Sequence, residues 1–143
     1  MWKKWLAVLC AALMLTGLVA CSSSTKADGV YTAEADDTYV DSNGYGWRDT
    51  LTLTYKDGKV VAAQFESYDA DGNAKSVPGN YEGMTPEPSE WIPQLSANVL
   101  AASSASSIDG IAGATIASGN AQKLYEAIEK NGKPGETIQV DLS

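Results

Sequence analysis

Residues 50–66 read TLTLTYKDGKVVAAQFE and carry the clearest structural signal in the chain. Threonines at every second position alternate with Leu51, Leu53 and Tyr55, and a second alternating run follows from residue 61. Between the two runs stands Asp57-Gly58, a pair typical of a tight turn because glycine accepts a positive φ. Side chains along a strand point alternately to its two faces, so residues 50–66 predict a β-hairpin with one apolar face.

Strands and loops are predicted on both sides of this hairpin. A short alternating stretch over 28–33 predicts a strand, and residues 36–46 predict a loop because they are rich in Asp, Gly and Asn. Residues 68–88 lack periodicity and predict a long loop, the kind that tends to be functional or to cover something. Residues 137–142 predict a closing strand.

Two segments have apolar residues at helical spacing, and they complete the predicted fold. These segments are 89–102 and 119–130, the second ending at Asn131-Gly132. We therefore expect an α+β domain, in which an antiparallel sheet contains the hairpin, two helices pack on the sheet and a C-terminal strand closes it.

The first 27 residues resemble a bacterial lipoprotein leader followed by a tether. Residues 1–20 have a basic start and an apolar run too short for a membrane span, as a secretory signal does. Leu18-Val19-Ala20-Cys21 matches the lipobox, which predicts that Cys21 is acylated and anchors the chain on the extracytoplasmic face of the cell membrane. The alternatives are a plain secretory signal, or an anchor with an incidental cysteine. Residues 21–27 form the expected tether, and residues 28–143 the domain.

The composition of the mature chain excludes several functions. Beyond the leader, 8 basic residues stand against 18 acidic ones, a net charge of −10, so we expect no nucleic-acid partner. The chain has no histidine, Cys10 lies in the leader and Cys21 is taken by lipid. A Ser-His-Asp triad, a disulfide and thiol redox chemistry are therefore not expected, and redox chemistry would need an organic cofactor. We expect no metal site either.

Residues 109–118, reading DGIAGATIAS, are the strongest candidate for a site. By residue type alone they are as readily a turn and a helix cap, with Thr115 or Ser118 as the capping side chain. Residues 109–115, however, resemble the flavinylation motif of the FMN-binding domain family, which reads Asp, two variable positions, Ser or Thr, then Gly-Ala-Thr. This family includes small surface lipoproteins and the extracytoplasmic flavoprotein subunits of Rnf and sodium-translocating NADH:quinone reductase complexes.

The resemblance extends along the mature chain and implies a function. It includes Asp28-Gly29-Val30-Tyr31, Gly46-Trp47-Arg48, the hairpin turn and the closing strand. It implies an electron carrier, rather than an enzyme with its own substrate, whose partners are a membrane redox donor and a flavin transferase of the ApbE type. That transferase moves FMN from FAD onto the last threonine of the motif, which by position is Thr115.

The resemblance assigns the other site residues by position. Asp109 matches the acidic residue of the motif, and Gly113 and Ala114 match its small pair. Ser118 offers a second hydroxyl nearby, and Trp47 with Arg48 is a candidate to flank the flavin ring. Packing of Trp47 at the edge of the core is the alternative.

One position departs from the motif. Ala112 stands where the family has Ser or Thr, so FMN bound without a covalent bond stays open as an alternative. A surface lipoprotein that keeps the fold without a cofactor and binds a ligand or protein partner is a second alternative. A hydrolase with a Ser or Thr nucleophile is disfavoured, because the chain has no histidine and no lysine adjoins the motif.

Overall fold

A computed structural model describes residues 26–143. The predicted signal peptide (1–20), the predicted lipidation site Cys21 and most of the predicted tether (21–27) lie outside the described residues. The elements are, in chain order, β1 (Gly29–Ala35), α2 (Asp37–Ser42), β2 (Arg48–Lys56), β3 (Lys59–Tyr68), α3 (Pro88–Ala101), the 3-10 helix η1 (Ala105–Ser107), α4 (Thr115–Asn131) and β4 (Thr137–Val140).

The strands form one sheet in the order β3-β2-β1-β4. The predicted hairpin is confirmed: β2 pairs antiparallel with β3, and the turn residues Asp57 and Gly58 have φ values of 52° and 77°. β1 pairs antiparallel with β2 on its other side, whereas β4 joins β1 in parallel. The α+β prediction is thus confirmed, and the parallel fourth strand is a detail that the sequence pattern does not specify.

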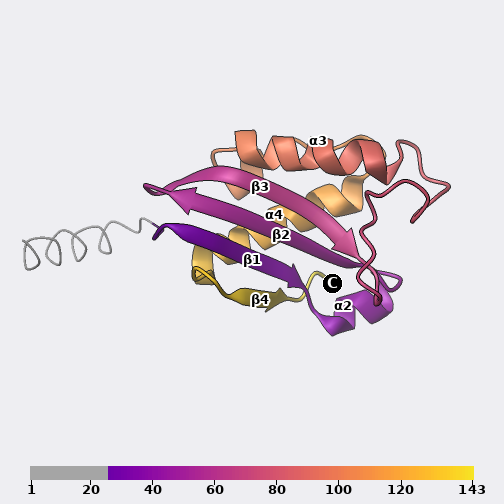
Figure 1. Ribbon diagram of the computed structural model, residues 1–143, viewed down its shortest axis with the longest axis horizontal. Helices are drawn as coiled ribbons and strands as arrows, with labels where there is room; N and C mark the ends of the chain where they lie inside the picture. Colours follow the sequence, from indigo (N-terminus) through magenta and orange to yellow (C-terminus); the bar gives the residue numbers. More distant parts are fainter. Residues whose placement is uncertain (1–25) are drawn as a thin grey trace, which may run out of the picture.

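Two helices cover one face of the sheet. Leu51 lies beside Ala33 on one neighbouring strand and beside Phe65 on the other, and all three are fully buried. α4 packs against β1 and β2 over this apolar face, and α3 packs against β3 (Figure 1). β3 is an edge strand, and the Ser96 hydroxyl of α3 accepts a hydrogen bond from the Phe65 N–H at 2.9 Å. A helix thereby covers that edge of the sheet.

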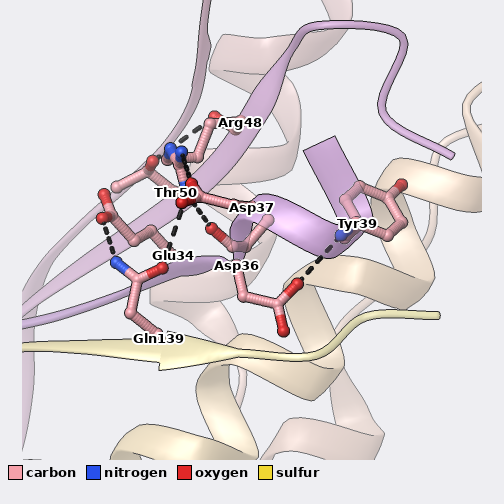
Figure 2. A network of polar contacts seen from close by, with 8 residues as sticks. Glu34, Asp36, Asp37, Tyr39, Arg48, Thr50 and Gln139 are labelled. Carbon is pink, nitrogen blue, oxygen red and sulfur yellow. Dashed lines mark hydrogen bonds and ion pairs between the residues drawn. The ribbon is translucent and has the colours of Figure 1, made fainter. Parts of the chain in front are cut away.

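The prediction that residues 36–46 form a loop is wrong for half of that stretch, because residues 37–42 form α2. Asp36 caps this helix, its side chain accepting a hydrogen bond from the Tyr39 N–H at 2.9 Å. Arg48, at the start of β2, donates to the Ala35 carbonyl and pairs with Asp37 (Figure 2). The cap and the Arg48 contacts hold a six-residue helix that is too short to be stable by itself.

The second predicted helix begins earlier than expected. α4 starts at Thr115, not at residue 119, and Ala114 occupies its N-cap position. Ser118 and Gly119 are weak helix formers, which hides the first turn in the sequence. The Ser118 hydroxyl donates to the Ala114 carbonyl at 2.8 Å, so its polar group is satisfied within the helix.

Candidate functional site

A pocket of about 540 Å³ lies where the first turn of α4 meets the loop after α2 and the long loop after β3. Its walls include Trp47, Lys75, Tyr81 and Thr115, which come from three separate parts of the chain. A pocket of this volume is in the range that holds small molecules and cofactors.

The amino end of α4 forms one side of this pocket. Thr115 is the first helical residue, and its side chain is exposed. The Ala114 cap has no side-chain hydrogen bond, and the first turn carries no acidic residue. The N–H groups at a helix start lack partners within the helix, and together with the helix dipole they favour an anion. This side of the pocket therefore suits a phosphate.

Aromatic rings and a cation also line this pocket. Trp47 and Tyr81 meet edge to face, with ring centroids 5.8 Å apart. The Lys75 ammonium lies 5.0 Å from the centre of the Trp47 ring and 4.5 Å from that of Tyr81. Burial lowers the pKa of Lys75, while the nearby carboxylates of Asp49 and Glu66 act to raise it. A flat ligand entering here meets aromatic surface and positive charge together.

A buried carboxyl group lies beneath Lys75. Asp49 is 7% exposed and accepts hydrogen bonds of 2.8 Å from the Ser67 hydroxyl and the Asn120 amide. The same Asn120 amide group donates to the Tyr39 hydroxyl at 2.8 Å, so α4 is tied both to β2 and to α2. Burial raises the pKa of Asp49, and the bonds from Asn120 and Ser67 and the charge of Lys75 oppose that rise.

The structure brings four of the predicted site residues to this pocket. Gly113, Ala114, Thr115 and Trp47 line it. Gly113 also has a packing reason to be glycine: its φ is +85°, and an added Cβ would lie 2.7 Å from the Thr85 carbonyl oxygen. Ala114 is 4% exposed, so its side chain belongs to the core rather than to an open approach.

Ser118 and Asp109 do not line the pocket. Besides donating to Ala114, the Ser118 hydroxyl accepts from the Ile111 N–H at 2.9 Å, so it holds the preceding loop against α4. The Asp109 side chain is exposed, and its main-chain carbonyl accepts a hydrogen bond from Asn98 at 3.0 Å. These contacts give both residues a role in shaping the loop.

The cation beside Trp47 is not the one expected from the sequence. Arg48 is engaged by Asp37 and Ala35 and does not line the pocket. Its neighbour in β2, Asp49, does line it, because adjacent residues of a strand point to opposite faces. Lys75 takes that place, and Asp49 lies below it. Neither was predicted: a lysine in a long loop carries no periodic signal, and Asp49 looks like a polar strand residue until Asn120 covers it.

Residues 26–143 contain neither a membrane span nor a metal site. No helix in this range is long and apolar enough to span a bilayer. No group of three or more His, Cys, Asp or Glu side chains in this range is arranged to hold a metal ion.

Comparisons with known proteins place the chain among small bacterial proteins. It is 29% identical over 141 residues to the 15 kDa lipoprotein of Treponema pallidum (strain Nichols), covering 94% of each chain. It is 30% identical to a Clostridium thermocellum protein solved by NMR, over 72% of this chain and 92% of that one, with a TM-score of 0.45. No family model matches the chain.

One solved structure is similar in both sequence and fold. The crystal structure of the CPE2226 protein from Clostridium perfringens aligns with a TM-score of 0.70 and 31% identity, over 81% of this chain and 98% of that one. Agreement over nearly all of that protein, in sequence as well as in fold, indicates common descent. The chain therefore belongs to the same protein family as the CPE2226 protein.

Proposed function

We propose that this chain is a membrane-anchored, extracytoplasmic flavoprotein that carries FMN for electron transfer and has no substrate of its own. One observation carries the proposal: the amino end of α4, with Thr115 as its first residue and no capping side chain, lines a pocket that is also lined by aromatic rings and a cation. FMN has a phosphate at one end and a flat ring system at the other. The helix end suits the phosphate, and the aromatic and cationic part of the lining suits the ring system.

The residues of the pocket fit such a cofactor chemically. The N–H groups of the first turn of α4 and the Thr115 hydroxyl would hold the phosphate. Trp47 and Tyr81 would contact the ring, and Lys75 would place a positive charge beside it. Bound FMN would supply the one- or two-electron chemistry that this chain lacks, and the side chains around it would hold it and tune it.

Covalent attachment through Thr115 is the second part of the proposal. A flavin transferase of the ApbE type would join the Thr115 oxygen to the FMN phosphorus, breaking the pyrophosphate bond of FAD and releasing AMP and the hydroxyl proton. The threonine side chain is exposed, so its oxygen is accessible to such an enzyme. Ala112, also exposed, leaves the transferase without the hydroxyl that the family motif has at that position.

A lipid anchor at Cys21 is the third part. The relative named a lipoprotein aligns with 94% of this chain, and Leu-Val-Ala-Cys has the lipobox pattern. Acylation would keep the carrier beside a membrane redox donor on the outer face.

The test is to co-express the full chain with a flavin transferase and to measure its intact mass, and its visible absorption after denaturation. We expect one FMN per chain in the wild type and none in Thr115→Ala. Thr137→Ala is the matched control, because Thr137 is an exposed threonine on β4 outside the pocket. Ala112→Thr restores the family motif, and we expect it to raise the fraction of chains loaded.

The other outcomes are equally informative. Wild-type protein that binds free FMN but gains no covalent mass would refute the phosphoester alone. Wild-type protein that neither gains flavin mass nor binds FMN would refute the carrier. It would favour instead a cofactor-free surface lipoprotein that uses the same pocket for another ligand.

A further inference from the structure

A second pocket, of about 520 Å³, lies beside the carboxyl-terminal half of α4. Its polar lining includes Tyr55, Tyr125, Lys26, Lys59 and Glu129. Tyr125 is ten residues after Thr115, which corresponds to about 15 Å along a helix axis. Figure 1 shows the hairpin turn, the start of β1 and the end of α4 at the same end of the molecule, away from α2.

Two buried tyrosines open into this second pocket. Tyr55 is 6% exposed and Tyr125 is 4% exposed, yet neither hydroxyl has a hydrogen-bond partner within residues 26–143. Both tyrosines line the second pocket, which gives a ligand access to their side chains. By contrast, the Tyr31 hydroxyl donates to the Ala27 carbonyl at 2.6 Å. Buried tyrosine hydroxyls usually have a partner, and here the pocket is where one would bind.

The chemistry of the lining defines the class of ligand. Burial raises the pKa of Tyr55, and the neighbouring Tyr125 and Glu129 raise it further, so its phenol stays protonated and acts as a donor. Burial and Glu129 do the same for Tyr125. Two phenol donors and two ammonium groups suit an oxyanion. Glu129 has only acceptor atoms to offer, so the same ligand should carry an N–H or O–H donor.

The lining of the second pocket carries positive charge. It has two lysines against one glutamate, on a chain whose described residues sum to −10. Around this lining acidic residues stand among the basic ones: Asp28 precedes β1, Asp57 follows Lys56 in the hairpin turn, and Lys130 pairs with Glu126 on α4. The attraction for an anion is therefore confined to the lining itself.

The second pocket also lies close to the predicted anchor. Lys26 lines the pocket and is five residues after Cys21, a stretch that spans at most about 18 Å when fully extended. The Lys26 ammonium donates to the Gly132 carbonyl at 3.2 Å, which fixes the start of the domain against the end of α4. An acylated Cys21 would hold the mouth of the pocket near the lipid surface.

We propose that the second pocket binds the headgroup of a phospholipid in the membrane that holds the chain. The phosphate binds to Lys59, Lys26 and the two tyrosine hydroxyls, and a headgroup amine or hydroxyl donates to Glu129. This proposal rests on the lipid anchor of the proposed function and is independent of FMN. It implies that the hairpin turn and the end of α4 face the membrane, and that the first pocket points away from it.

The test uses the mature lipidated protein in a neutral detergent, with sn-glycero-3-phosphoethanolamine as the soluble headgroup probe. Ring signals of the seven tyrosines are followed by NMR during the titration and assigned with Tyr55→Phe and Tyr125→Phe. We expect the Tyr55 and Tyr125 signals to shift together. Lys59→Gln should weaken binding at least tenfold, which corresponds to about 1.4 kcal/mol and is the low end for a hydrogen bond to a charged group.

Lys133→Gln is the matched control, because Lys133 is an exposed lysine at the same end outside the pocket, and we expect less than a twofold change. Equal weakening by Lys133→Gln and Lys59→Gln, or no shift of the two tyrosines, would overturn the site. Inorganic phosphate binding as tightly as the headgroup would overturn the lipid as its source. Phosphoethanolamine and phosphocholine carry no glycerol hydroxyls and differ in whether the nitrogen has N–H donors. Phosphocholine should therefore bind more weakly, and equal binding of the two would overturn the role of Glu129.

The two proposals fail separately. Acyl mass at Cys21 and flavin absorption are measured on the same sample. A protein that binds the headgroup without any flavin refutes only the flavin carrier, whereas a flavin-loaded protein whose second pocket ignores the headgroup refutes only the lipid site.

Discussion

Replacing Gly113 by alanine tests whether the loop before α4 has a left-handed residue packed tightly against residues 85–86. Gly113 has a φ of +85°, and an added Cβ would lie 2.7 Å from the Thr85 carbonyl oxygen and 2.9 Å from Cδ of Pro86. A left-handed conformation costs a residue with a Cβ about 1–2 kcal/mol. Overpacking adds about 1–3 kcal/mol, since one contact is with main chain that cannot swing aside. We therefore expect Gly113→Ala to lower the free energy of unfolding by about 2–5 kcal/mol.

Gly72→Ala separates the cost of the left-handed backbone from the cost of overpacking. Gly72 has a nearly identical φ of +82°, but nothing lies within 4 Å of its added Cβ. Its substitution should cost only the backbone part, about 1–2 kcal/mol. Each Gly→Ala change lowers the conformational entropy of the unfolded chain by the same amount, so this contribution cancels when the two variants are compared. The assay is urea unfolding followed by tryptophan fluorescence. Equal losses of unfolding free energy in the two variants would show that residues 85–86 do not pack against Gly113. That result would contradict the shape described for the first pocket.

Three further substitutions examine the surroundings of that pocket. Burial raises the folded-state pKa of Asp49 above its unfolded value, so the free energy of unfolding falls as pH rises between the two values. In urea titrations Asp49→Asn should therefore gain stability relative to wild type as pH rises above the unfolded-state pKa of an aspartate, and a difference that stays constant with pH would contradict this. Arg48→Met should lower the free energy of unfolding by only about 1 kcal/mol, because its partner Asp37 is largely exposed. If the pair holds α2, the same change should also speed amide hydrogen exchange in that helix. Lys75→Met should weaken non-covalent FMN binding about tenfold in a fluorescence titration, whereas Lys123→Met, outside the pocket, should not.

The hairpin could be predicted because its signals are local. Alternation fixes which side chains face the helices, and Asp57-Gly58 fixes the turn through its positive φ values. The irregularity between Thr54 and Tyr55, where the register with β3 shifts, has no such signal. It depends on how both strands pack on the helices, and one sequence does not display that packing.

The helix boundaries show where local signals fail. Residues 37–42 look like a loop by composition. They are helical because Asp36 caps them, Arg48 contacts them from β2, and their own Tyr39 is buried in the core. Tyr39 buries its ring among residues distant in sequence, with 4% of its surface exposed. Tertiary contacts therefore override a weak propensity. The sequence indicates this helix only through Asp36, a residue type that often caps a helix, placed three residues before Tyr39.

The candidate site was predictable only in part, for a related reason. Thr115 and Gly113 stand in one short motif, whereas Lys75 and Tyr81 reach the pocket from a long loop that has no periodicity. Asp49 becomes buried only when Asn120 of α4 docks on it. A motif can thus locate the part of the pocket that suits a phosphate. Of the residues that would contact a ring system, Trp47 was predicted, whereas Lys75 emerges only from the fold.

The length of α4 relates the two proposed sites. Its 17 residues correspond to about 25 Å, and the two pockets lie beside its opposite ends. If the headgroup site faces the bilayer, α4 holds the first pocket roughly its own length away from the lipid surface. Tyr45 and Ile116, 88% and 74% exposed beside that pocket, would then face outward where a redox partner can reach them. A donor within the membrane would need an extracytoplasmic part of comparable height to reach the pocket. Two variants of the lipidated protein in vesicles, one spin-labelled at residue 116 and the other at residue 133, would test this orientation. A paramagnetic agent bound to the lipid should relax the label at residue 133 and not the label at residue 116.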